Sequence, residues 1–161
     1  DYIQSWDCTF KDAQSSDYVV GQVWARKGSS RYLLDQVRGR MSFTETIRAV
    51  RSLSAKWPQA VRKLIEDKAN GTAVIDVLRR ELPGLIPVEP EGGKIVRANA
   101  VTAVAEAGNV FLPDPSIAPW VHDFVEEHAM FPNGANDDQV DAQSQANTYY
   151  NSSSFSLEGL L

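Results

Sequence analysis

Ile3-Gln4-Ser5-Trp6-Asp7-Cys8-Thr9-Phe10 is predicted to form the first β-strand of this protein. Residues 18–25 and 31–37 are predicted to form the next two strands, and the short turn between them contains Gly28. Two runs joined by a short glycine-containing loop are typical of an antiparallel hairpin. The chain is therefore predicted to begin with a three-stranded antiparallel meander.

Helices and further strands are predicted to alternate after the meander. Ser42 is a candidate N-cap, and Glu45 three residues later completes a capping box for a helix that ends before Pro58. The apolar run that ends at Ile65 is typical of a buried central strand. The remaining elements are predicted as strands over 61–66 and 85–88, helices over 72–82, 94–107, 120–128 and 137–150, and an extended piece over 110–113.

This order predicts an α/β fold. Its mixed sheet has five or more strands, three antiparallel and then parallel ones, with helices on both faces, which is the ribonuclease-H-like arrangement. Alternation of strands and helices places strand ends at one edge of the sheet, where sites in α/β proteins usually lie. We expect one domain over residues 1–150 and a flexible C-terminal tail over residues 151–161, which contains three consecutive serines.

Composition restricts the class of protein. The chain has 161 residues, 43% of them apolar and 23% charged, as in a globular domain with a substantial core. No apolar run approaches the roughly 20 residues that cross a bilayer, and no leader precedes the first strand. We therefore expect neither membrane insertion nor secretion, and the abrupt start indicates a fragment of a longer protein. The net charge of −5 argues against simple adhesion to nucleic acid.

A single cysteine, Cys8, excludes an internal disulfide. Its neighbour Asp7 would suit a catalytic thiol. However, alternation along a strand turns the two side chains to opposite faces, and Cys8 is predicted to pack as a small hydrophobic residue.

Acidic residues stand at three distant places, each beside the end of a predicted strand or helix. Asp7 lies in the first strand, Glu66 and Asp67 end the fourth, and Asp137, Asp138 and Asp141 open the last helix. Carboxylates that converge are hard oxygen ligands for Mg²⁺ or Mn²⁺, and such ions drive phosphodiester hydrolysis.

Each acidic position also has a purely structural interpretation. Asp7 could be hydrogen-bonded to a loop, and Glu66 and Asp67 could be a solvated strand end of which only one faces a site, with Glu66 favoured. Asp137 could cap the last helix. Asp138 and Asp141 share a face of that helix, where two carboxylates repel unless a cation lies between them.

Basic residues near these acids are candidates for DNA contacts. Lys94 and Arg97 follow the Gly92-Gly93 loop at a helix start, where a phosphate could bind. Lys68 lies beside the acidic strand end and could orient a carboxylate or the scissile phosphate. Arg26 and Lys27 lie in the hairpin turn. The alternative is a set of solvated surface charges, and no base-reading motif is present.

Three segments together resemble the nuclease domain of the large terminase subunit of tailed bacteriophages. They are residues 5–12, Ser-Trp-Asp-Cys-Thr-Phe-Lys-Asp; residues 65–71, Ile-Glu-Asp-Lys-Ala-Asn-Gly; and residues 136–142, Asn-Asp-Asp-Gln-Val-Asp-Ala. They occur in the family's order and cover nearly the whole chain. The resemblance implies that Asp7, Glu66 and Asp138 are the core metal ligands and catalytic residues, and that Asp141 supports a second metal. The secondary candidates are Asp137, Asp67 and Asp12.

The resemblance implies a metal-dependent DNA endonuclease that cuts concatemeric viral DNA during genome packaging, with two Mg²⁺ or Mn²⁺ ions as cofactors. The expected partners are double-stranded DNA, the protein's own N-terminal ATPase domain, the portal and the small terminase subunit. The expected location is the host cytoplasm, outside the mature virion. No phosphate-binding Gly-x-x-x-x-Gly-Lys-Ser/Thr loop is present, so no ATPase activity is expected of this segment. The alternatives are a junction resolvase, an RNA–DNA hybrid nuclease, or a non-catalytic module that binds DNA or the portal.

Overall fold

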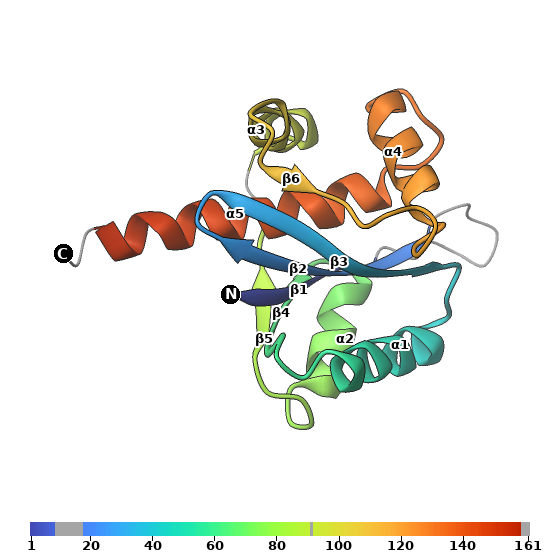
Figure 1. Ribbon diagram of the computed structural model, residues 1–161. Coiled ribbons are helices and arrows are strands. Elements are labelled where there is room, and N and C mark those ends of the chain that lie inside the picture. Colours follow the sequence, from blue (N-terminus) through green and yellow to red (C-terminus); the bar gives the residue numbers. More distant parts are fainter. Residues whose placement is uncertain (9–17, 91, 159–161) are drawn as a thin grey trace.

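A mixed β-sheet forms the centre of the protein, which is described by a computed structural model over residues 1–8, 18–90 and 92–158. Within these residues the sheet has six strands in the order β5-β4-β1-β2-β3-β6 (Figure 1). The strands are β1 (Tyr2–Asp7), β2 (Val19–Lys27), β3 (Ser30–Gly39), β4 (Arg62–Glu66), β5 (Leu85–Val88) and β6 (Val110–Phe111).

Strand directions match the predicted meander and its parallel extension. β1 pairs with β2, and β2 with β3, in antiparallel register, whereas β4 lies parallel to β1 and β5 parallel to β4. β6 is an addition, because it pairs parallel with β3 at the opposite edge of the sheet. The predicted ribonuclease-H-like α/β arrangement is confirmed.

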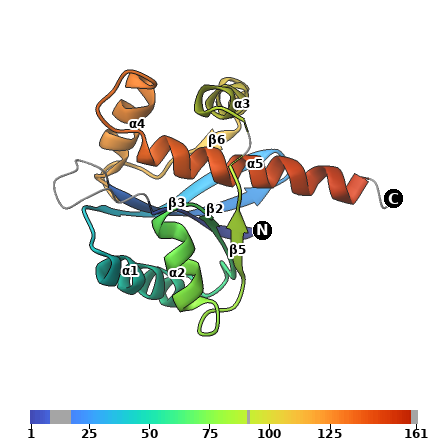
Figure 2. The same ribbon diagram turned by 180° about the vertical axis from the view of Figure 1, so that it is seen from behind.

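Helices cover both faces of the sheet, as predicted. α1 (Phe43–Lys56) and α2 (Asn70–Leu78) lie on one face, and α3 (Lys94–Glu106), α4 (Val121–Met130) and α5 (Asp138–Glu158) lie on the other (Figures 1 and 2). The predicted capping box at α1 is partly visible, because the Ser42 Oγ accepts a hydrogen bond of 3.2 Å from the Glu45 backbone N.

Two apolar clusters result from the alternation of side chains along the strands. Trp6 and Ile65 point toward α1 and α2, whereas Leu64 points toward α4 and α5. Trp6 also explains a glycine on the neighbouring strand. A Cβ on Gly21 would lie 2.5 Å from the Trp6 ring, so only glycine lets the indole lie flat on β2.

Polar contacts fix α5 across the sheet. The Ser5 Oγ donates to the Ala142 carbonyl oxygen at 2.6 Å, the Arg31 Nη1 to the Asn147 carbonyl at 3.2 Å, and the Arg26 Nη1 to the Tyr150 carbonyl at 2.8 Å. Because these donors lie on β1, β2 and β3, α5 crosses the meander in one defined register.

Three elements end three or more residues away from the predicted position. β1 ends at Asp7, and residues 9 and 10 of the predicted strand fall outside the described residues. α2 ends at Leu78 and not at residue 82. α5 continues beyond Tyr150 to Glu158, because no Pro or Gly interrupts residues 151–158 and Asn151 is held by Arg31. No helix in the described part of the chain is long and apolar enough to cross a membrane.

Candidate functional site

Asp7 and Glu66 lie side by side at the carboxyl ends of two adjacent parallel strands. The β1–β4 register pairs Trp6 with Ile65, so the next residue on each strand is one of these two acids. Asp7 is only 3% exposed. Burial raises the pKa of the Cys8 thiol, and the negative charges of Asp7 and Glu66 raise it further. Cys8 is therefore a buried neutral thiol, as predicted, and both carboxylates lie near it.

Asp138 joins the same edge of the sheet from the start of α5. Its side chain is 4% exposed, and its Oδ2 accepts a hydrogen bond of 3.1 Å from the Tyr18 backbone N. Tyr18 immediately precedes β2, in which Val20 pairs with Asp7. The ends of β1 and β4 and the first turn of α5 thus lie at one edge, so the predicted acids are gathered there and not dispersed.

Asp141 lies one turn further along α5 and faces α3. Burial raises the pKa of its carboxyl to about 6, and the nearby positive charge of Lys94 limits that rise. The Lys94 Nζ lies 3.1 Å from the Asp141 Oδ2 and also forms an ion pair with the Asp137 carboxylate. Asp137 therefore binds α3 through its side chain.

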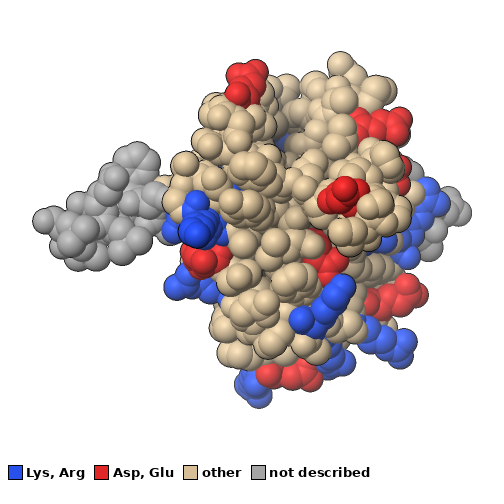
Figure 3. All heavy atoms as spheres, in the orientation of Figure 1, with Lys and Arg blue, Asp and Glu red and all other residues tan. Residues whose placement is uncertain are grey.

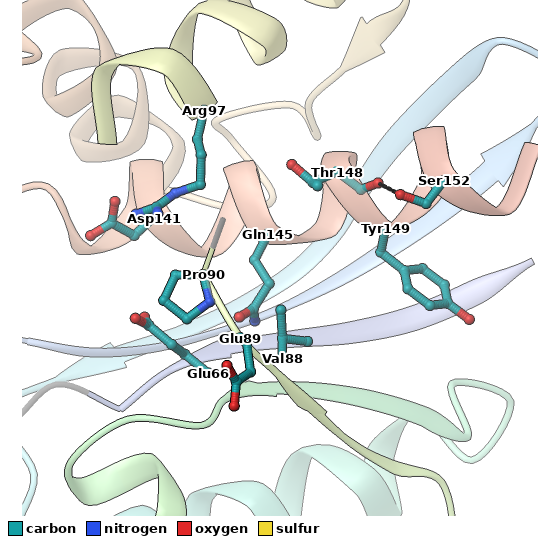
Figure 4. A pocket seen from close by; sticks show the side chains of 10 residues that line it. All are labelled: Glu66, Val88, Glu89, Pro90, Arg97, Asp141, Gln145, Thr148, Tyr149 and Ser152. Atoms are coloured by element: carbon teal, nitrogen blue, oxygen red, sulfur yellow. Dashed lines mark hydrogen bonds between the residues drawn. The ribbon is translucent and has the colours of Figure 1, made fainter. Parts of the chain in front are cut away.

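A pocket of about 230 Å³ connects the strand-end acids to α5. Figure 4 shows Glu66 on one side, Asp141 and Arg97 on the other, and Gln145 between them. The pocket continues along α5 past the hydroxyl groups of Thr148 and Ser152 (Figure 4). Two of the predicted acids, from different elements, therefore share one solvent-accessible pocket with a guanidinium group.

The geometry separates Glu66 from its neighbour Asp67. Glu66 lines the pocket, whereas the Asp67 Oδ1 accepts a hydrogen bond of 2.8 Å from the Thr72 Oγ1 at the start of α2. This arrangement favours Glu66 over Asp67 as the site carboxylate, in line with the alternation argument.

Sequence reasoning missed Gln145, which lies in the middle of the site. Its Nε2 donates to the Ser5 Oγ at 3.0 Å and contacts the carbonyl oxygens of Trp6 and Leu64 at 3.2 and 3.3 Å. It thereby ties α5 to β1 and β4 just before Asp7 and Glu66. Its position four residues after Asp141, on the same helix face, is the signal that could have identified it.

Four principal acids are candidates for a metal site: Asp7, Glu66, Asp138 and Asp141. All four supply carboxylate oxygens, which are the ligands that hard divalent cations prefer. Their arrangement is looser than that of a formed metal centre. No group of three or more His, Cys, Asp or Glu side chains that could hold a metal ion is found within residues 1–8, 18–90 and 92–158. Repulsion among carboxylates and the attraction of Asp137 and Asp141 to Lys94 both favour this separation. A cation shared by these acids would require their side chains to move together.

The predicted DNA-binding residues fall into two groups. Lys27 and Lys68 are exposed, and Arg97 lines the pocket while its Nη1 donates to the Gly92 carbonyl oxygen at 2.9 Å. Arg26 and Lys94, in contrast, are engaged within the protein by Tyr150 and by the α5 acids. The secondary candidate Asp12 lies outside the described residues. Figure 3 shows acidic and basic side chains interspersed on the face that is turned to the viewer in Figure 1, without one broad basic patch.

Known proteins were compared with this chain by sequence and by structure. The sequence matches the family described as the terminase RNaseH-like domain over residues 4–149. Curated protein sequences give no match.

Solved structures resemble the fold. The large terminase nuclease of the thermophilic phage G20c with bound magnesium has a TM-score of 0.67 at 17% identity, covering 92% of this chain and 82% of that chain. The nuclease domain of the bacteriophage SPP1 large terminase with bound Mn has a TM-score of 0.62 at 16% identity, covering 91% of this chain and 85% of that chain. The large terminase of a second thermophilic bacteriophage has a TM-score of 0.68 at 11% identity, covering 89% of this chain and 38% of that chain.

At such low identities, likeness to solved structures establishes the fold alone. The family match is a separate finding and extends from β1 into α5, so it includes all four principal acids. On that match, the chain belongs to the terminase ribonuclease-H-like domain family.

Proposed function

We propose that this domain is a divalent-metal-dependent endodeoxyribonuclease that cleaves concatemeric viral DNA during genome packaging. The observation that carries the proposal is that Asp7, Glu66 and Asp138 lie at one edge of the sheet. Asp141 lines the same pocket as Glu66, and the chain belongs to the terminase family. Three different elements supply these carboxylates, as expected for a site that chain folding assembles for chemistry.

Asp7, Glu66 and Asp138 would hold the catalytic cations, and Asp141 would complete the second position. Divalent Mg²⁺ or Mn²⁺ held by these residues would supply the activation of a water molecule and the stabilisation of the leaving 3′ oxygen that phosphodiester hydrolysis needs. The protein's own contribution is to hold these carboxylates at the ends of β1 and β4 and in the first turn of α5. Asp7 is suited to a central place among these ligands, because it is buried next to Glu66 at the edge of the sheet that Asp138 also reaches.

Arg97 would bind a phosphate of the substrate strand, because it lines the pocket opposite Glu66, on the side of Asp141 (Figure 4). Lys68 and Lys27 are exposed and would contact the backbone further away. These contacts carry no base specificity, so the domain alone would cut duplex DNA with little sequence preference. An ATPase domain of the same protein, the portal and the small subunit would position the DNA in the complete assembly.

A plasmid assay tests the proposal directly. Supercoiled DNA is incubated with the domain and Mn²⁺, with and without a chelator, and nicked and linear products are quantified. We expect cleavage that the chelator abolishes. Equal survival of the plasmid in both reactions at high protein concentration would overturn the proposal.

Asp7→Asn is the matched variant, because the amide keeps the size of the side chain but removes its charge. We expect folded protein without cleavage, verified by circular dichroism and by thermal melting. A panel with duplex DNA, RNA–DNA hybrid and a four-way junction distinguishes the alternatives. Cleavage restricted to the hybrid or to the junction would argue for one of the other ribonuclease-H-like nucleases.

A further inference from the structure

The first turn of α5 is capped by a side chain from another helix. Backbone N–H groups in the first turn of a helix have no acceptor within it. The Val140 N, in this turn, donates instead to the Glu127 Oε2 of α4 at 2.8 Å. Glu127 thus does from a distance what an N-cap side chain ordinarily does.

The two aspartates at the start of α5 do not cap this turn, because each binds another partner. Asp137 is the candidate cap from the sequence, but its carboxylate binds Lys94. The Asp138 Oδ2 accepts from the Tyr18 backbone N. With Glu127 serving Val140, Asp138 is oriented toward the start of β2, at the edge where Asp7 and Glu66 lie.

Glu127 is itself held in place. Its side chain is buried, its Oε1 accepts from the Gln139 Nε2 at 3.0 Å, and the Arg38 Nη2 lies 3.9 Å away. Two consecutive residues of α5, Gln139 and Val140, therefore bind the two oxygens of one carboxylate. Hydrogen bonds to a charged acceptor are stronger than those between neutral groups, so these two bonds restrict rotation and translation of the start of α5.

Buried glutamine side chains continue this hydrogen-bond network into the sheet. The Gln36 Nε2 donates to the Gln139 Oε1 at 2.8 Å, and the Gln22 Nε2 donates to the Gln36 Oε1 at 2.9 Å and to the Gln139 carbonyl at 3.1 Å. The Trp24 Nε1 donates to the Gln22 Oε1 at 2.9 Å. β2, β3, α4 and α5 are thus linked at the residue next to Asp138.

We infer that Glu127 is a positioning residue for Asp138, which it orients through the backbone of Val140 and the side chain of Gln139. The inference rests on the proposed function, since it assigns Asp138 to a cation site. Glu127 would act without touching metal or DNA. Groups that orient metal ligands typically alter metal affinity by about 10- to 100-fold when removed.

Mn²⁺ titration calorimetry of the domain tests the inference in parallel with thermal melting. Glu127→Ala removes both acceptor oxygens, and we expect the Mn²⁺ Kd to rise about 10-fold in protein that is still folded. Glu127→Gln retains one acceptor oxygen, and its Kd should fall between those of the parent and Glu127→Ala. Glu126→Ala is the matched control, because Glu126 is the preceding, exposed residue of the same helix; its Kd should equal that of the parent.

The outcomes separate this inference from the proposed function. A parent domain that binds no Mn²⁺ would overturn both. A parent that binds Mn²⁺, with Glu127→Ala folded and equally tight, would overturn the positioning role alone. If Glu127→Ala does not fold, the Mn²⁺ Kd of Glu127→Gln is measured well below its melting temperature. A lower melting temperature with an unchanged Kd would show that Glu127 only stabilises the fold, and would overturn the positioning role.

Discussion

A Cβ atom on Gly71 would lie 2.0 Å from the carbonyl oxygen of Glu66. Real side chains do not approach a backbone oxygen so closely, so the start of α2 fits against the end of β4 only with glycine at this position. The Glu-Asp-Lys-Ala-Asn-Gly segment is therefore a packed turn that sets where the Glu66 carboxylate projects. Its last residue makes the close approach possible.

Gly71→Ala should displace either α2 or the end of β4. Such a clash in a packed region costs about 1–3 kcal/mol, and we expect the urea midpoint to fall accordingly. Mn²⁺-dependent plasmid cleavage should fall as well, because Glu66 moves. Gly93→Ala is the control, since its Cβ would meet no atom within 4 Å. Equal midpoints for the two variants would contradict this view of the turn.

Replacing Glu66, the last residue of β4, and replacing Asp67, which follows it, should have different effects on cleavage. Glu66→Gln removes a charge from the pocket, and we expect cleavage to fall by more than about 100-fold with little change in thermal stability. Asp67→Asn retains an oxygen that can accept from Thr72, so cleavage should persist. Initial rates at saturating Mn²⁺ measure both. If Asp67→Asn were the inactive variant, the assignment of Glu66 would be reversed.

Local sequence patterns predicted most of the fold. The meander followed from the hairpin turn, and the central strand from its apolar run, because both signals are short-range. β6 was missed as a strand because its two residues pair with β3 across a long separation in sequence. The end of α5 was missed because Asn151 is retained by Arg31, a tertiary contact that helix propensity does not include.

The candidate acids could be proposed from the sequence, but the polar residues packed around them could not. Glu127 and Gln145 act through contacts with β1, β4 and the start of α5, all distant in sequence. Nothing in the sequence around Glu127 distinguishes it from a solvated polar side chain of a helix, and the signal at Gln145 is limited to its spacing of four residues from Asp141. Likewise, the internal roles of Arg26 and Lys94 depend on where α5 lies.

Arg26 and Lys27 are adjacent in sequence but should respond differently to removal. Arg26 donates to the Tyr150 carbonyl oxygen, and its Cζ lies 5.0 Å from the centroid of the Tyr150 ring. Arg26→Ala should therefore lower the free energy of unfolding by about 1–2 kcal/mol. Lys27 is exposed, and Lys27→Ala should leave stability unchanged while weakening DNA binding and reducing its salt dependence by about one counterion. Chemical denaturation and fluorescence anisotropy at several salt concentrations measure the two effects. Weaker DNA binding by fully folded Arg26→Ala would show that Arg26 also contacts DNA.

Lys94 should compete with divalent cations for the carboxylates of α5. Its ammonium contacts both Asp137 and Asp141, so a cation that used the same oxygen of Asp141 would displace it. The lysine is partly exposed, so each contact is worth only about 0.2–1 kcal/mol after solvent screening.

Lys94→Met retains the aliphatic chain without the charge, and we expect the Mn²⁺ Kd to fall by about 3- to 10-fold in titration calorimetry. Lys27→Met removes an equal charge from the hairpin turn and should leave the Kd unchanged, which controls for the overall charge of the domain. DNA affinity should change in the opposite direction if a released Lys94 binds phosphate, because the variant then lacks that contact. A Kd that rises in Lys94→Met would mean that the lysine supports the cation site by holding Asp141 in place. A constant Kd would mean that the lysine and the cation do not compete.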